Sequence, residues 1–375
     1  MLEHLHFRKL GRWEQNELYY EMECHGTTLR ATTYKDALRF YLKVNPKNLM
    51  FCIGFLEGIL STYDWTHEML EKEKHVVMCE INEKDSYFNF RDKIDRLLWG
   101  KDPLSMPILG SEGNVQSFTL QQMLDFKRQI FCKENIAIVI TGKASEIEIL
   151  AINEKLCKYN LSEKKEICFS TNKLLGTRQL NIQIIKNSWN PIEIKLIFDV
   201  DPYKNSLKIA ELLSLIIGGG TGSILACRIR EELGYTYDIS SNFDSYKDIA
   251  YIEIGFMTDP EYFYQCLEQI IDILNSAKKD INQRDMDINL PFFADNCEFW
   301  LNEPETLNRY ISTKIFSELK SFSIEDIIKT DREINLTDLK TVASNIFVKN
   351  NCSIIIAGET NRISKRHIST MLDKL

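Results

Sequence analysis

Two stretches of the chain carry nearly the same hydrophobic pattern. Residues 130–142 read IFCKENIAIVITG and residues 346–358 read IFVKNNCSIIIAG, 216 positions further along. Each follows an amphipathic segment with the period of a helix, 120–129 or 336–345, and each ends in an apolar run typical of a strand. Because a repeated pattern indicates repeated construction, the sequence predicts two similar lobes that each close with a helix followed by a strand.

The remaining pattern predicts a mixed α+β protein in which each lobe is a β-sheet covered by helices. A polar, irregular segment over residues 161–180 predicts a linker between an N-terminal lobe, 1–160, and a C-terminal lobe, 181–375. In the first lobe we expect helices over 3–9, 14–24, 47–63, 65–89 and 120–129, and a strand within 26–34. In the second lobe we expect strands over 192–198, 236–242 and 250–257, and helices over 207–217, 223–232, 260–277, 290–319, 323–330 and 336–345.

A glycine-rich corner lies between two of these elements. Residues 218–237 read GGGTGSILACRIREELGYTY, with Gly234 where the C-cap of a helix is expected. Arg230 and Tyr237, seven residues apart, flank the corner from helix to strand. Pattern alone favours a buried glycine packing site beside a solvated, charged helix end over a pair of side chains that bind a ligand.

Composition narrows the classes of function. The 375 residues are 44% apolar and 27% charged with a net charge of −8, and acidic and basic residues are mixed along the chain, which argues against a dedicated nucleic-acid-binding surface. No apolar run is long enough to cross a membrane, and the N-terminus lacks the apolar core of a signal peptide. The ten cysteines include no C-x-x-C pair, so we expect a reduced, cytoplasmic protein.

Several motifs together resemble the pitrilysin/insulinase family of zinc peptidases, the inverzincins. In that family the first helix of a lobe carries H-x-x-E-H and a distant glutamate completes the zinc site. Residues 1–4, MLEH, match the last four positions of that motif, and Glu73 and Glu80 match a glutamate pair whose second member binds the metal. Arg230 and Tyr237 match an arginine–tyrosine pair that, in the family, holds the peptide carbonyl and the developing oxyanion.

The sequence departs from the family at its start. The first histidine of H-x-x-E-H and the strands that precede it in the family have no counterpart in the 375 residues, so the resemblance implies a first lobe without its opening strands. Glu3 would stand in the position of the general base, with His4 and Glu80 as remaining ligands. His6 could substitute for the absent histidine, although residues i and i+2 point to different faces of a helix. We therefore expect no working metal site in this chain, no cofactor of its own, and zinc in a partner subunit.

The resemblance extends to a division of labour. Short two-lobe members truncated at the first helix resemble the noncatalytic partner subunit of a heterodimeric bacteriocin leader peptidase of the subtilosin type. This implies a homologous partner with a complete H-x-x-E-H motif, a peptide substrate bound through Arg230 and Tyr237, and no nucleic-acid or membrane partner. Two alternatives stay open: a scaffold or peptide-binding subunit without catalysis, and a self-sufficient metallopeptidase whose start lies upstream of Met1.

Overall fold

The computed structural model divides the chain into two compact units. The first unit comprises residues 1–170 together with Pro304–Thr313, and the second comprises residues 171–303 and 314–375. The structure describes residues 1–83, 86–159, 180–202, 204–246, 249–318 and 334–375. The predicted linker, except for Leu180, and the predicted helix over 323–330 lie outside these described residues.

The second unit is built on a five-stranded sheet with the strand order β5-β9-β6-β8-β7. The strands are β5 (Asn181–Lys186), β6 (Ile192–Val200), β7 (Ile239–Ser245), β8 (Ala250–Thr258) and β9 (Cys352–Gly358). β5 runs parallel to β9, and the other neighbours are antiparallel. The central strand, β6, therefore pairs with a partner on each side.

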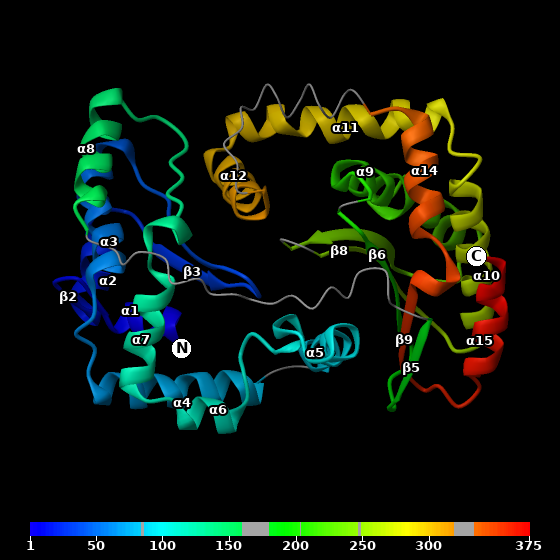
Figure 1. The fold of residues 1–375 in the computed structure, drawn as a ribbon, viewed down its shortest axis with the longest axis horizontal. Helices are drawn as coiled ribbons and strands as arrows, with labels where there is room; N and C mark the ends of the chain where they lie inside the picture. The colour runs from blue at the N-terminus through cyan, green and yellow to red at the C-terminus, as the bar shows by residue number, and fades with distance from the viewer. Residues whose placement is uncertain (84–85, 160–179, 203, 247–248, 319–333) are drawn as a thin grey trace. The chain divides into compact units, whose positions relative to one another are not determined.

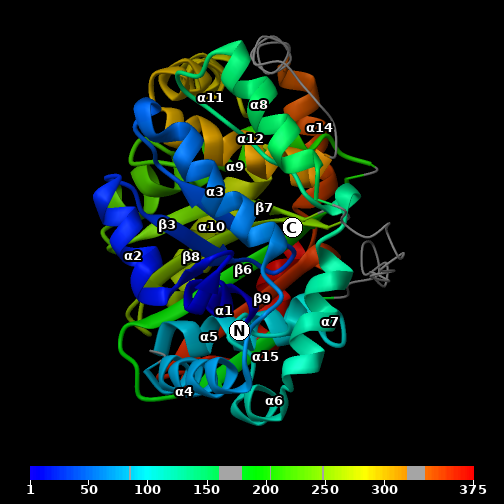
Figure 2. The same ribbon diagram turned by 90° about the vertical axis from the view of Figure 1, so that its left-hand side faces the viewer.

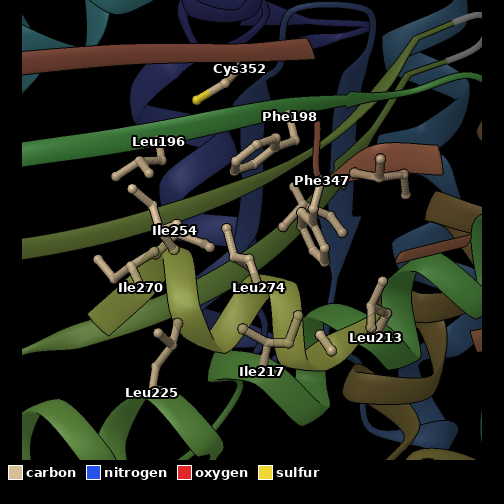
Figure 3. Close-up of a cluster of buried hydrophobic side chains, with 14 of the residues drawn as sticks. Leu196, Phe198, Leu213, Ile217, Leu225, Ile254, Ile270, Leu274, Phe347 and Cys352 are labelled. Atoms are coloured by element: carbon tan, nitrogen blue, oxygen red, sulfur yellow. The ribbon is translucent and has the colours of Figure 1, made fainter. Parts of the chain in front are cut away.

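Helices cover one face of this sheet (Figures 1 and 3). They are α9 (Leu207–Gly218), α10 (Phe263–Ala277), α11 (Gln283–Asn302), α14 (Leu336–Ile346) and α15 (Lys365–Met371). Alternate residues of β6, such as Leu196 and Phe198, are fully buried against them. Phe198 meets Phe347, which follows α14, edge to face with ring centroids 5.2 Å apart. The period-two pattern of β6 thus places one apolar face on the helices.

The glycine corner begins with a close contact between α9 and β7. The hydroxyls of Ser214 and Ser241 lie 2.8 Å apart. A Cβ atom on Gly218 would lie 2.5 Å from the backbone nitrogen of Ser241, so only glycine fits there. The chain then forms a π-helix, Ala226–Glu232, and Gly234 follows with φ +65°, as a helix C-cap requires.

The first unit is mostly helical. Its helices are α1 (Leu2–Arg8), α2 (Gln15–Cys24), α3 (Leu49–Ser61), α4 (His67–Glu83), α5 (Ser86–Trp99), α6 (Glu112–Ser117), α7 (Leu120–Ile130) and α8 (Glu146–Cys157). The first residues of α12 (Pro304–Glu318) also belong to it. Helices α1 and α2 lie side by side (Figures 1 and 2). Their core side chains, among them Leu5 and Leu18, pack with Phe55 of α3 and Leu70 of α4.

Only short sheets occur among the described residues of this unit. β1 (Lys9–Leu10) pairs with β2 (Trp13–Glu14), and β3 (Leu29–Thr33) pairs with β4 (Leu38–Leu42), both antiparallel. The predicted α+β class with two lobes is confirmed.

Four predicted elements differ from the structure. The expected strand at the end of the first repeat does not form: residues 136–142 pair with no strand of the described residues. Helix α5 continues to Trp99, beyond the predicted end at 89. The helix expected over 290–319 is two helices, because Pro304 begins a new one. β7 begins at Ile239 rather than 236, because the Thr236 hydroxyl donates to the carbonyls of Asp238 and Met257.

The close approach of α9 to β7 predicts different costs for two neighbouring glycines. Gly218→Ala should lower the free energy of unfolding by about 1–3 kcal/mol, as overpacking of a tight core does, because its Cβ would meet Ser241. Gly220→Ala should change it by less than about 0.5 kcal/mol, since nothing lies within 4 Å of that Cβ. Urea unfolding of the two variants checks this, and equal effects would contradict the contact.

Candidate functional site

The candidate metal residues of the first unit come together on α1 and α4. The side chains of His4 and Arg8 share one face of α1 because four residues separate them, and both bind the buried carboxylate of Glu73. His4 Nδ1 lies 2.9 Å from Glu73 Oε2, and Arg8 Nε donates to the other oxygen, Oε1. Burial alone would raise the pKa of Glu73, but the hydrogen bonds from His4 and Arg8 outweigh it and hold that pKa below its usual value.

Glu80 lies seven residues after Glu73 on α4. Its Oε2 lies 3.8 Å from His4 Nε2, and the side chain is about half exposed. His4 therefore directs one ring nitrogen at Glu73 and the other toward Glu80. Glu3, in the position of the general base, accepts a hydrogen bond from the Thr33 hydroxyl of β3.

This arrangement does not fit a catalytic zinc ion. Such a site typically has three protein ligands and an open position for water. His4 and Glu80 face each other, whereas both oxygens of Glu73 are already engaged by His4 and Arg8. Over the part of the chain that the structure describes, no cluster of three or more His, Cys, Asp or Glu side chains has the geometry to hold a metal ion.

His6 does not supply the third ligand, because it points into the core. It is fully buried, its Nδ1 donates to Leu2 O at 2.8 Å, and its Nε2 accepts from Lys127 Nζ at 3.0 Å. Burial lowers the pKa of His6 to about 3, so the ring is neutral. Lys127 also donates to the carbonyls of Ile59 and Thr62, at 2.8 and 2.6 Å. Burial lowers the pKa of Lys127 to about 7.

The predicted peptide-binding pair lies in the second unit. Arg230 is on the π-helix, and its guanidinium contacts only the neighbouring carboxylate of Glu231, at 2.6 Å, among the interactions of the described residues. Tyr237 follows Gly234 and is 94% exposed. Both side chains are therefore accessible within this unit. π-Helical turns occur frequently at functional sites, and the hydrophobic pattern, which reads as an ordinary helix, did not indicate one.

Sequence reasoning missed two residues of the first unit. Arg8 binds the second carboxylate oxygen of Glu73. The only indication of this role in the sequence is its spacing of four residues from His4. Lys127 reads as a solvated residue of an amphipathic helix but is completely buried. No pattern in the sequence pairs it with His6.

Comparison with known proteins agrees with the motifs and the fold. Residues 1–112 match the family described as Insulinase (Peptidase family M16), and residues 117–289 match the one described as Peptidase M16 inactive domain. The chain belongs to the M16 family of peptidases. None of its described helices is long and apolar enough to cross a membrane.

The similar proteins span nearly the whole chain. An "Uncharacterized zinc protease" of Rickettsia bellii is 22% identical over 95% of this chain and 86% of its own length. The "Uncharacterized zinc protease YmxG" of Bacillus subtilis is 22% identical over 96% and 88%. A protease from Helicobacter pylori has the same fold with a TM-score of 0.81 at 17% identity, covering 95% of this chain and 88% of that one. A Pseudomonas fluorescens structure described as a peptidase M16 inactive domain gives a TM-score of 0.79 at 16% identity, covering 96% and 86%.

The engaged carboxylate of Glu73 predicts a pH-dependent contribution to stability. Glu73→Gln should lower the free energy of unfolding at pH 7 by about 1–3 kcal/mol, because it leaves a buried donor of His4 or Arg8 without an acceptor. Since the pKa of Glu73 is lowered by folding, its contribution is present above the unfolded pKa and is lost as pH falls through the lower folded value.

Denaturant unfolding between pH 7 and pH 3 measures this effect. The difference between Glu73→Gln and the unmodified chain should shrink toward acid pH. Glu80→Gln is the matched control on the same helix: its carboxylate is half exposed and 3.8 Å from His4, so a change below about 0.5 kcal/mol is expected. An undiminished difference at pH 3 would contradict the assignment.

Proposed function

We propose that this chain is one subunit of a heterodimeric zinc peptidase and that its partner, a homologous subunit with a complete H-x-x-E-H motif, carries the metal. The observation that carries the proposal is the incomplete ligand set on α1 and α4: His4 faces Glu80, while Glu73 is already held by His4 and Arg8. This chain supplies Arg230 and Tyr237.

The chemistry of Arg230 and Tyr237 suits the binding of a peptide during hydrolysis. A guanidinium and a phenol are donors that can bind a peptide carbonyl and stabilise the negative charge that develops on its oxygen. Arg230 has one carboxylate contact, Glu231, on the residue next to it, and Tyr237 is almost wholly exposed. Both side chains can therefore reorient toward a substrate without breaking contacts in the core.

The substrate we propose is a short, unfolded peptide, and in particular the leader segment of a ribosomal bacteriocin precursor. An unfolded peptide can add to the open edge of a sheet through main-chain hydrogen bonds, which requires little sequence specificity. The resemblance to truncated two-lobe subunits supports the choice of leader peptides. Eight cysteines of the described residues are free, in keeping with a cytoplasmic setting.

A scaffold or peptide-binding subunit without catalytic residues is the second candidate. The same incomplete ligand set favours it, and so does the match of residues 117–289 to the domain described as inactive. The two candidates differ in one respect: a scaffold subunit has no need of the Arg230 guanidinium or the Tyr237 hydroxyl.

Metal content and activity test the division of labour. The purified chain alone should retain no stoichiometric zinc after dialysis and should not cleave a quenched-fluorescence peptide, because the described residues offer no third ligand beside His4 and Glu80. Mixed with a homologous H-x-x-E-H subunit from the same genome, it should restore cleavage. Stoichiometric zinc together with peptidase activity in the single chain would overturn the proposal and favour a self-sufficient enzyme.

Substitutions in the mixture test the roles of Arg230 and Tyr237. Arg230→Ala and Tyr237→Phe should each lower kcat by about 10²–10³-fold with a smaller change in KM, as expected when an oxyanion donor is lost. Arg228→Ala is the matched control, because this neighbouring arginine of the same π-helix binds Gln269 and Glu232 instead. Full activity of both Arg230→Ala and Tyr237→Phe would leave the scaffold role as the explanation.

A further inference from the structure

The hairpin β3–β4 has two faces of different chemistry. Apolar residues of both strands pack on the core of the first unit: Leu29, Leu38, Phe40 and Leu42. Because successive side chains of a strand point to opposite faces, Arg30 and Thr32 of β3 lie on the other face together with Arg39 and Tyr41 of β4. The register places Arg30 opposite Tyr41, and Thr32 opposite Arg39. We call these four residues the outer face of the hairpin.

Tyr41 lies beside two guanidinium groups on the outer face. The central carbon of the Arg30 guanidinium is 5.9 Å from the centroid of the Tyr41 ring, and that of Arg39 is 5.2 Å from it. Arg30 Nη1 also donates to the Tyr41 hydroxyl at 3.1 Å. A guanidinium that packs on an aromatic ring keeps its positive charge. Two positive charges are therefore held around one tyrosine.

No carboxylate of the described residues neutralises either charge. Other arginines of the described residues form ion pairs with carboxylates, namely Arg8, Arg91, Arg128, Arg228 and Arg230. Among the same residues, the Arg30 guanidinium contacts Tyr41 instead, and that of Arg39 contacts Tyr41 and the side-chain oxygen of Asn308 in α12, at 3.3 Å. A guanidinium has five N–H donors, so most donors of both arginines have no acceptor in the described part of the chain.

Helix α12 contacts only the β4 half of the outer face. Glu305 of α12, which belongs to the first unit, accepts from the Tyr41 hydroxyl at 3.4 Å and lies 3.6 Å from Lys43 Nζ. The negative charge of Glu305 is therefore offset by Lys43. The two β4 residues of the outer face are half-buried, whereas Arg30 and Thr32 of β3 are exposed. A ligand of this face has access from the β3 side.

We propose that Arg30 and Arg39 bind a carboxylate side chain of the peptide substrate, and that this subunit prefers peptides with Asp or Glu at one position. The inference rests on the proposed function, since it assigns a specificity to the same peptide. A guanidinium presents parallel N–H groups to the two oxygens of a carboxylate, and such charge-assisted hydrogen bonds are about twice as strong as neutral ones. Tyr41 is a positioning residue, because its ring contacts both guanidinium groups and its hydroxyl accepts from Arg30.

The geometry of an extended peptide agrees with this charge. Among the described strands, β3 pairs with β4 alone. A peptide that extends along β3 presents every second side chain to the outer face, and the one opposite Arg30 has its Cβ about 5 Å away. Opposite charges at such positions stabilise the pairing and like charges destabilise it. Main-chain hydrogen bonds then supply affinity, and the outer face supplies a preference for an acidic side chain over Lys or Arg.

Peptide binding to the full 375-residue chain, without the zinc subunit, tests the proposal. The probes are three fluorescein-labelled peptide libraries with amidated C-termini, composed of uncharged residues except for a fixed central Glu, Gln or Lys. In fluorescence anisotropy at low salt, the Glu library should bind about three- to fivefold more tightly than the Gln library, and the Lys library more weakly than either. The preference should shrink in 1 M NaCl, where the Debye length falls to about 3 Å.

Matched variants locate the effect. Arg30→Gln and Arg39→Gln should each lower the ratio of Glu to Gln affinity toward one and leave the affinity for the Gln library unchanged, because only a carboxylate uses the charge. Tyr41→Phe keeps the ring and removes the acceptor of Arg30 Nη1, so it should lower the ratio by less than Arg30→Gln. Arg12→Gln is the control: this arginine packs on the Trp13 ring at 4.7 Å, outside the hairpin, and the ratio should not change.

Three results would overturn the proposal. The first is equal binding of the Glu and Gln libraries by the unmodified chain. The second is a Glu preference that persists in the double variant Arg30→Gln, Arg39→Gln. The third is a preference for carboxylate only when the C-terminus of the peptide is left unamidated, which would assign the site to the end of the peptide. Each of these results leaves the proposed division of labour intact, whereas failure of all three libraries to bind would contradict both proposals.

Discussion

The pairing of a central strand on both of its edges is the constraint on which the second unit depends. In the second unit β6 joins β9 to β8, and its inward side chains, such as Phe198, form the floor on which α10 and α14 pack. A central strand satisfies two rows of backbone groups at once and covers the apolar residues of its neighbours. The burial of all of β9 follows from this arrangement.

The first unit has no central strand among its described residues. Residues 130–142 keep the repeated sequence and the geometry of the helix end. Residues 136–142 and the hairpin β3–β4 do not join a common sheet among the described residues. Polar side chains take over part of the packing. Lys127 stands in α7 where α14 has the small Ala343, and it is held by His6 and by the carbonyls at the end of α3. Phe131 rests on His6, whereas its counterpart Phe347 rests on Phe198 of β6.

Local rules accounted for much of the fold. The capping box of Thr119 and Gln122 at the start of α7, the amphipathic period of that helix and the glycine at Gly142 could all be predicted, because each depends on residues close in sequence. The strand over 136–142 was predicted wrongly because a strand exists only with a partner, and the partner is a matter of tertiary structure.

The candidate site shows the same limit. His4, Glu80, Arg230 and Tyr237 could be selected from their motifs, since residue type and spacing carry that information. The contact of Arg8 with Glu73 joins helices 65 residues apart, and the contact of Lys127 with His6 joins helices 121 residues apart. Neither contact produces a periodic pattern in the sequence. The π-helix that contains Arg230 could not be predicted either, because its hydrophobic pattern is that of an ordinary α-helix.

The contacts of α1 bear on how the site keeps its shape. One face of the helix is held by Glu73, through His4 and Arg8, and the other by Lys127, through His6. Glu73 is 4% exposed and Lys127 is fully buried, so both anchors lie in low-dielectric surroundings where hydrogen bonds are strong. Helix α1 is therefore fixed from both sides by side chains alone. The ring of His4, the ligand-like residue of this helix, is therefore held in place by protein side chains.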